Sequence, residues 1–311
     1  MTWRDSNVFI TGATGFVGQW LTRELLAKGA RLTLLVRDSV PQMLRFFGQC
    51  NIVRGDVCGQ SLLERILNEY DIQTVFHLAA QADVTFANVH PANAYQTNIM
   101  GTVALLEAVR RVKPDAMVVV ASSDKAYGDS GHLPYTEATP LEGRNPYDCS
   151  KSCADLVALS YLHSFGLRIA ITRCGNIYGG GDLDFKRLVP NTVRRLLRAQ
   201  TPVIYGCGTE TRDFFFVLDV VSAYLTLAEK DARGPYNFSL GEEITVRRMI
   251  ETICKLMDAP VHVQTLNQPH GMIAHQVLDS SRARAELGWT AAYSLESGLE
   301  KTIEWYREWL K

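Results

Sequence analysis

Residues 11–18 read TGATGFVG, and this glycine-rich stretch is the strongest local indication of the architecture. It follows an apolar run at 7–10 and opens a helical pattern. Glycines between a strand and a helix permit a tight turn and a close approach of the backbone to a ligand. The helix start offers free N–H groups to a pyrophosphate. A glycine triplet alone is a weak signal, because glycines also cap ordinary helices. In this strand-to-helix position, it predicts a dinucleotide site.

Short β-branched runs alternate with helical patterns on from this stretch. The runs include RLTLLV, NIVRGDV, TVFHLAA, AMVVVASS and IAITRC. Such alternation predicts an α/β fold, a Rossmann doubly wound parallel sheet with helices on both faces.

After about residue 180 the alternation weakens, and amphipathic helical patterns at 189–200 and 294–311 predict a smaller C-terminal lobe for the substrate. We expect a dinucleotide-binding domain over 1–180 and a substrate-binding lobe mainly over 181–311. The segment 212–235 is expected to cross back to the first domain.

The composition is that of an ordinary globular protein. The 311 residues are 47% hydrophobic and 21% charged, with a net charge of -1, so no bulk charge attracts nucleic acid or a membrane. Seven scattered cysteines without a CxxC pair predict neither a disulfide framework nor a metal site. No signal-peptide pattern opens the chain, and no apolar stretch reaches about 18 residues. We therefore expect a cytoplasmic protein without a membrane or nucleic-acid partner.

The end of the second predicted strand indicates which dinucleotide binds. An acidic residue there would hold the adenosine ribose 2′-hydroxyl, but LTLLVRDS puts Val36 at that place, followed by Arg37. Arg37 suits a 2′-phosphate or can stack on adenine, whereas Asp38 could turn toward a ribose. We expect NADP, with NAD as the alternative; an exposed loop arginine without a ligand is the third interpretation. Other dinucleotide contacts are expected in the glycine loop and after two further strands, at Gly12, Thr14, Gly15, Phe16, Val17, Gly18, Asp56, Val57, Leu78, Ala79 and Ala80.

A tyrosine and a lysine stand four residues apart in NPYDCSKSCADL, residues 145–156. On a helix this spacing puts Tyr147 and Lys151 on one face. An ammonium group there would lower the pKa of the phenol and prepare it to exchange a hydroxyl proton during hydride transfer. Such a pair alone is usually a surface contact, but together with a dinucleotide loop it predicts a catalytic pair.

The ordered set TGATGFVG, HLAAQADV, QTNIMGT, SSDKAYG, PYDCSK, RCGNIYGGG and TRDFFFVLDV covers nearly the whole chain. This set resembles the extended short-chain dehydrogenase/reductases, specifically the nucleotide-sugar epimerases and dehydratases. The resemblance implies a nucleotide-diphosphate sugar as substrate and a tightly bound, recycled dinucleotide. It implies that Ser123 hydrogen-bonds the sugar 4-hydroxyl, that Tyr147 is the base and that Lys151 orients the nicotinamide ribose. Substrate contacts are expected at Gln81, Ser123, Asn176, Leu188 and Arg212, with Asn176 and Arg212 on the diphosphate.

Within this family, SSDKAYG at 122–128 favours a 4,6-dehydratase and is most similar to the CDP-glucose 4,6-dehydratase type. Oxidation at C4 acidifies the C5 hydrogen, so a base can remove it while an acid protonates the departing C6 hydroxyl. Asp124 is the candidate acid, and Lys125, once neutral, is the candidate C5 base. A plain ion pair between them at a strand end is the alternative. Glu137 is a weaker candidate for a substrate or proton-relay contact.

Three other functions stay open at this stage. A nucleotide-sugar 4-epimerase would need Ser123, Tyr147 and Lys151 but neither Asp124 nor Lys125. A 4-keto sugar reductase would consume free NADPH, and a dinucleotide-sensing protein without catalysis would keep only the fold.

Two further expectations concern loops and assembly. The glycines of YGGGD at 178–182 predict a loop that closes over a ligand. LVALSYLHSF at 156–165 has too many apolar positions for one buried face, so with LLEAVRRV at 105–112 it predicts a homodimer. The resemblance points the same way.

Overall fold

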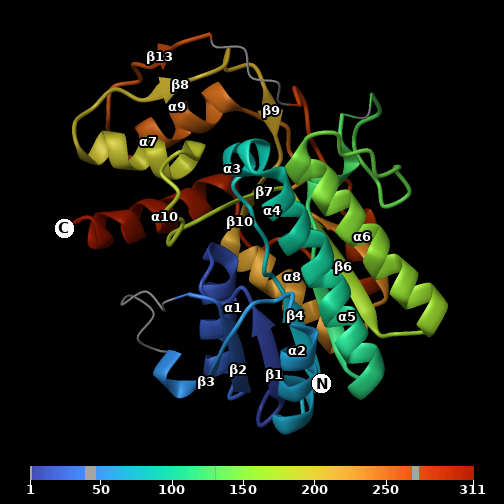
Figure 1. Cartoon of the computed structure of the whole chain (residues 1–311). Coiled ribbons are helices and arrows are strands. Elements are labelled where there is room, and N and C mark those ends of the chain that lie inside the picture. The colour runs from blue at the N-terminus through green and yellow to red at the C-terminus, as the bar shows by residue number, and fades with distance from the viewer. Residues whose placement is uncertain (1, 39–46, 130, 268–272) are drawn as a thin grey trace.

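The computed structural model describes residues 2–38, 47–129, 131–267 and 273–311. A central sheet of parallel strands runs in the order β11-β6-β5-β4-β1-β2-β3 (Figure 1). The order turns at β1, because β2 and β3 extend to one side of it and β4 begins the other side. The strands are β1 (Asn7–Thr11), β2 (Arg31–Val36), β3 (Asn51–Arg54), β4 (Thr74–His77), β5 (Met117–Ala121), β6 (Ile169–Cys174) and β11 (Gly234–Phe238).

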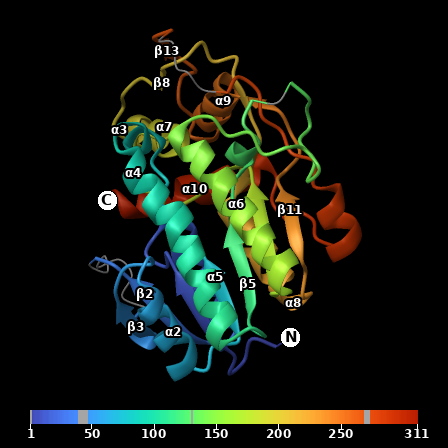
Figure 2. The same cartoon turned by 45° about the vertical axis from the view of Figure 1, so that its right-hand side comes forward.

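Helices cover both faces of this sheet. One face carries α1 (Phe16–Ala27) and α8 (Val217–Glu229), whose apolar residues share one core cluster. The other carries α2 (Gln60–Glu69), α5 (Gly101–Val112) and α6 (Pro146–Phe165), which share a second cluster. Figure 2 shows α5 and α6 side by side along the sheet. Burial on both faces explains why β5 reads MVVVA, an unbroken apolar run.

The C-terminal lobe lies beyond the carboxyl ends of the central strands (Figure 1). Its helices α7 (Leu188–Leu197), α9 (Val246–Leu256) and α10 (Leu295–Trp309) pack around a separate apolar cluster. Three short strand pairs lie outside the central sheet: β7 (Asn176–Tyr178) with β10 (Phe214–Phe216), β9 (Thr211–Arg212) with β12 (Ile244–Thr245), and β8 (Val203–Ile204) with β13 (Gln264–Thr265). The remaining short elements are α3 (Val84–Val89), α4 (Pro91–Tyr95), η2 (Gln96–Met100), η3 (Asp124–Tyr127) and η4 (Ala283–Leu287).

The predicted doubly wound α/β fold is confirmed by this sheet. The segment 214–229, which the sequence could assign to either lobe, forms β10 and α8, and α8 lies against α1. The chain then adds β11 at the edge of the central sheet beside β6. The domain boundaries near residue 180 stay a prediction.

Within the described residues, no helix combines the length and the apolar character needed to cross a membrane. The cytoplasmic location stays a prediction.

Candidate active site

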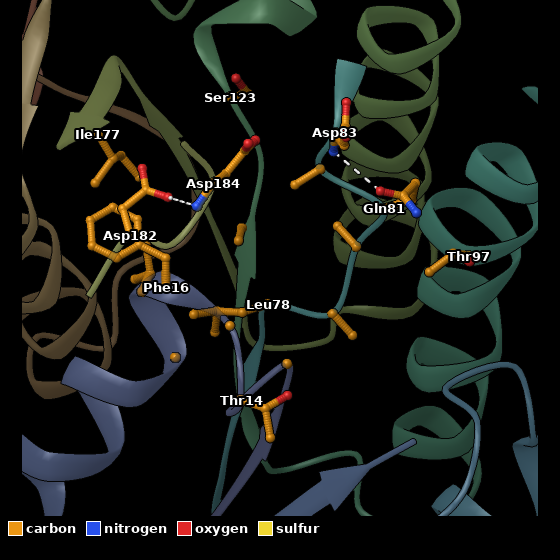
Figure 3. Close-up of a pocket in the computed structure, with 18 of the residues that line it drawn as sticks. Thr14, Phe16, Leu78, Gln81, Asp83, Thr97, Ser123, Ile177, Asp182 and Asp184 are labelled. Carbon is orange, nitrogen blue, oxygen red and sulfur yellow. Dashed lines mark hydrogen bonds between the residues drawn. The ribbon is translucent and has the colours of Figure 1, made fainter. Parts of the chain in front are cut away.

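A cavity of about 870 Å³ lies over the carboxyl ends of the central strands. Its lining comes from the glycine loop, from the residues after β2, β3, β4 and β5, from the start of α6 and from segment 174–187. Figure 3 shows Thr14 and Phe16 at the glycine loop, Ser123 after β5 and Asp182 from the later segment around one space. The cavity sits where the strand order turns, which is where open α/β sheets bind their ligands.

The glycine loop has the shape that a dinucleotide requires. Gly12 has a φ of 74°, and a Cβ built there would lie 2.7 Å from the backbone nitrogen of Ala79. A Cβ on Gly18 would lie 2.1 Å from the carbonyl oxygen of Gly12. Gly15 precedes the first turn of α1 without a side-chain cap, so the N–H groups of that turn are free to face a phosphate. The loop therefore fits a pyrophosphate held by backbone groups.

The rim of the cavity holds the residues that were expected to select the dinucleotide. Arg37 and Asp38 both line it, and the Nε of Arg37 lies 3.0 Å from the Oδ2 of Asp38. Both side chains are largely exposed, at 59% and 74%. Asp56 lines the cavity too, and its Oδ1 accepts a hydrogen bond from the backbone of Cys58 at 2.9 Å.

A buried histidine that sequence reasoning missed supports the glycine loop from below. His77 ends β4, and its Nδ1 lies 2.8 Å from Thr11 Oγ1 while its Nε2 lies 3.0 Å from Thr102 Oγ1. The Thr11 hydroxyl also accepts the backbone N–H of Ala79 at 3.2 Å. Burial, with the nearby charge of Lys151, lowers the pKa of His77 to about 3. The ring is therefore neutral and supports the loop through its hydrogen bonds to Thr11 and Thr102. Buried polar neighbours of this kind leave no local sequence signal.

The predicted catalytic tyrosine and lysine lie in the first turns of α6. Lys151 is buried, and its ammonium donates to the carbonyl oxygen of Ala121 at the end of β5, 2.8 Å away. Burial lowers the pKa of Lys151 to about 8. Tyr147 lines the cavity, and burial, with the charges of Asp124 and Asp148, raises its pKa to about 12. The expected lowering of the phenol pKa is therefore not found, because burial outweighs the cations around it.

Asp124 and Lys125 begin the short helix η3 directly after β5, and both line the cavity. Asp124 is 2% exposed, and its Oδ1 accepts from the hydroxyl of Ser123 at 3.0 Å. Its Oδ2 is buried and has no hydrogen-bond partner in the described part of the chain. The ammonium of Lys125 donates to the side-chain oxygen of Gln276, not to Asp124. Burial lowers the pKa of Lys125, while Asp124 opposes that change. This geometry is not that of an exposed ion pair.

The structure brings most of the predicted residues to one cavity but not all of them. Among the predicted residues, every one named for catalysis or the dinucleotide lines it, as do Gln81 and Asn176. Leu188 and Arg212 lie outside the lining. Arg212 is 8% exposed and donates to the carbonyl oxygens of Thr211 and Ala274.

Glu137 differs from its expected role. Its Oε1 accepts the backbone N–H of Asn237 at 2.8 Å, and its carbonyl oxygen accepts from Arg173, which forms a buried ion pair with Asp155. Glu137 is thus part of a buried scaffold and lies outside the cavity lining.

Segment 178–187 carries cavity residues that no motif indicated. Asp182 and Arg187 line the cavity and form an ion pair at 2.7 Å. The second glycine-rich stretch, YGGGD at 178–182, lies against α1, because the carbonyl oxygens of Gly180 and Gly181 accept from Trp20 and Gln19. Its closure over a ligand stays a prediction. These contacts join distant segments, so no local pattern predicts them.

The fold and the cavity together define a Rossmann enzyme whose dinucleotide loop faces a serine, a tyrosine and a lysine, as in the extended short-chain dehydrogenase/reductases. The chain belongs to the GDP-mannose 4,6 dehydratase family, whose model matches residues 9–302. The predicted resemblance to nucleotide-sugar dehydratases and epimerases is confirmed.

Two curated relatives match this chain over almost its full length. The CDP-glucose 4,6-dehydratase of Salmonella typhimurium is 32% identical and matches 99% of this chain and 92% of its own. The dTDP-glucose 4,6-dehydratase of Xanthomonas campestris pv. campestris is 29% identical and matches 96% of this chain and 92% of its own.

Solved structures of both kinds of enzyme share the fold. The UDP-glucose 4-epimerase of Thermotoga maritima, with UDP-glucose, superposes with a TM-score of 0.92 at 27% identity, over 98% of this chain and 100% of that chain. The dTDP-glucose 4,6-dehydratase of Streptomyces venezuelae, with NAD bound, gives 0.89 at 28% identity over 97% of each chain. Fold similarity alone therefore does not separate a dehydratase from an epimerase.

Proposed function

We propose that this chain is a nucleotide-sugar 4,6-dehydratase, which converts a nucleoside-diphosphate hexose to the 4-keto-6-deoxy sugar. The observation that carries the proposal is the acid-and-amine pair Asp124 and Lys125, which shares one cavity with Ser123, Tyr147 and Lys151. An epimerase has no use for that pair, whereas loss of water needs both an acid and a base. The two curated relatives described above are both dehydratases.

The first half of the reaction falls to Ser123, Tyr147 and Lys151. Ser123 hydrogen-bonds the sugar 4-hydroxyl, and Tyr147 takes its proton. Lys151 holds the nicotinamide ribose. Burial raises the pKa of Tyr147 to about 12, and the positive charge of Arg187 opposes that change. The glycine loop would hold the dinucleotide, which would supply a hydride acceptor for the sugar C4 and, after loss of water, a hydride donor for C6.

The second half falls to Asp124 and Lys125. Lys125 removes the C5 proton once C4 is a ketone, and Asp124 protonates the C6 hydroxyl as it leaves. Burial lowers the pKa of Lys125. More of the amine is therefore neutral and able to act as a base. Asp124 is 2% exposed, and its Oδ2 has no hydrogen-bond partner among the described residues. That oxygen can therefore face the C6 hydroxyl and give it a proton as it leaves.

A panel of CDP-, GDP-, UDP- and dTDP-sugars, incubated with the enzyme and analysed by mass, tests the activity and its nucleotide together. Loss of one water from a single member is the expected result. An isomer of unchanged mass would instead indicate a 4-epimerase and would contradict the proposal.

For the dinucleotide we propose retained NADP(H), on the strength of Val36 and Arg37 after β2. The guanidinium of Arg37 is exposed at the cavity rim and available to a 2′-phosphate. Asp38 competes for that guanidinium at 3.0 Å and is the group that would hold a ribose if NAD binds instead. Denaturing the purified protein and identifying the released dinucleotide decides between them, and NAD alone would reverse the assignment.

We also propose a homodimer that pairs α5 and α6 with their copies. Met100, Leu156 and Phe165 are exposed at 47%, 52% and 54% on or beside these two helices. Large exposed apolar side chains on one face are typical of an interface. Light scattering at micromolar concentration should give twice the monomer mass, and a monomer would overturn the proposal.

A further inference from the structure

The partner of the Lys125 ammonium comes from a distant part of the chain. Lys125 lies in η3, and its Nζ donates to the Oε1 of Gln276 in the C-terminal lobe. Gln276 is completely buried, while Lys125 keeps partial exposure to the cavity. Among the described residues no ion pair joins Lys125 to Asp124, its neighbour in η3. The amide of Gln276 therefore decides where this amine points.

The backbone around Gln276 is held on two sides. Its own N–H donates to the carbonyl oxygen of Thr211 at 3.3 Å, and the carbonyl oxygen of Val277 accepts from Tyr135 at 2.9 Å. The N–H of Leu278 donates to the Oδ2 of Asp213 at 3.0 Å. The side chain is thus presented to Lys125 from a fixed position.

The orientation of the amide has a cost that packing does not explain. An ammonium group only donates hydrogen bonds, so Gln276 must turn its oxygen toward Lys125. This leaves the Nε2 of Gln276 buried without a hydrogen-bond partner among the residues that the structure describes. An apolar side chain of the same length would fill the space without burying an unpaired N–H group. The glutamine is therefore better explained by Lys125 than by the core.

We propose that Gln276 is a positioning residue, whose amide oxygen holds the Lys125 amine in the cavity and sets how readily it gives up its proton. The consequence for catalysis rests on the proposed function, in which Lys125 is the C5 base. A neutral acceptor orients the ammonium but stabilises its charge less than a carboxylate would. The Lys125 amine is thereby held in one orientation and can still lose its proton.

The charged groups around Lys125 come from several elements. Asp124 of η3 and Asp148 of α6 raise its pKa, while Arg212 of β9 and Arg187 before α7 lower it, and burial, the largest effect, lowers it. Tyr147 of α6 faces the same cavity. A substitution of Gln276 leaves all these groups in place. A change in the pKa of Lys125 in such a variant therefore comes from the loss of the Gln276 amide.

Two substitutions of near-equal size should move the titration of Lys125 in opposite directions. Gln276→Met removes the acceptor, so the pKa of Lys125 should fall by about one unit, and Gln276→Glu adds a charge, so it should rise by at least about one unit. The measurement is competitive acetylation of the full-length protein with acetic anhydride over a pH series. The Lys125 peptide is quantified by mass spectrometry against the exposed Lys255.

Opposite shifts in the two variants support the inference, because a loss of packing alone would not reverse sign. The same titration of Lys125 in wild type and both variants would overturn it. Each variant is first checked for cooperative unfolding. Because the pKa of Lys125 is expected to fall in one variant and to rise in the other, a single variant that folds is enough to test the inference.

The same variants separate this inference from the proposed function. If the acetylation shifts but no nucleotide sugar loses water, the dehydratase proposal fails and the role of Gln276 stands. If water is lost and the acetylation does not move, the role of Gln276 fails alone. Where both hold, the acid limb of the turnover profile should shift with the acetylation, to lower pH in Gln276→Met and to higher pH in Gln276→Glu.

Discussion

The glycine loop and the helix η3 follow two strands of the same sheet, and they build a polar site in opposite ways. The loop after β1 uses backbone N–H groups, and its side chains are reduced to hydrogen at Gly12 and Gly18, where a Cβ would collide. The stretch after β5 uses side chains, with Asp124 buried and Lys125 half-buried beside groups from α6 and the C-terminal lobe. The loop depends on shape and is indifferent to protonation. The η3 region depends on charge and on partners from elsewhere.

The largest effect is expected from Tyr147→Phe, which keeps the ring and removes the proton acceptor. Turnover should fall at least about 100-fold, since no base remains for the 4-hydroxyl. In the wild type the pKa of Tyr147 is raised to about 12, so turnover should increase with pH across the neutral range as the phenolate becomes accessible.

The product assay is the appearance of the 4-keto sugar, with dinucleotide content measured in parallel. Tyr161→Phe on the same helix is the matched control and should behave like wild type, since Tyr161 contacts Glu107 away from the cavity. Wild-type turnover by Tyr147→Phe would remove the tyrosine from the mechanism.

Asp124→Asn and Lys125→Met test whether η3 serves dehydration alone. Both should still oxidise C4, seen as reduced nicotinamide absorbance, while product formation falls about 100-fold. Deuterium exchange at C5 then distinguishes them: Lys125→Met should not exchange, and Asp124→Asn should exchange without losing water. Normal product formation in both variants would reject the dehydratase assignment.

Gly18→Ala tests the shape dependence of the other region. Its Cβ would lie 2.1 Å from the carbonyl oxygen of Gly12, so the turn must open, and overpacking of this kind costs about 1–3 kcal/mol. Dinucleotide affinity, measured by calorimetry on protein stripped of nucleotide, should weaken roughly tenfold or more by the same principle. Gly48→Ala is the control, because no atom of the described residues lies within 4 Å of a Cβ there. Equal affinities in the two variants would show that the close approach does not matter.

A pH dependence of stability is expected from His77 beneath the glycine loop. The pKa of this buried ring is lowered to about 3. Between the ordinary histidine pKa and that value, the unfolded chain binds a proton that the folded chain does not. The free energy of unfolding should therefore fall with decreasing pH in this window, by up to about 1.4 kcal/mol per pH unit from this group. Urea unfolding at a series of pH values should give a shallower slope for His77→Gln, and an unchanged slope would mean that other groups control acid unfolding.

Features that depend on neighbours along the chain were readable from the sequence. The strand–glycine–helix order at 7–18 predicted the dinucleotide loop, and the alternation of runs predicted the doubly wound sheet, because a parallel strand needs a crossover helix. Tyr147 and Lys151 were predicted together because residues four apart share a helix face. Asp124 and Lys125 stand in a stretch that follows a buried strand, and their roles were predicted from the resemblance to the 4,6-dehydratases.

Features that depend on distant segments were decided only by the tertiary structure. Gln276 meets Lys125 across 151 residues, Asp182 and Arg187 reach the cavity from a loop, and Glu137 is drawn into a buried scaffold with Arg173. The raised pKa of Tyr147, against the expectation from Lys151, has the same origin. Spacing in the sequence determines which side chains share one element, whereas burial and long-range contacts depend on how all the elements pack. The acid–base character of the site is therefore a property of the packed molecule.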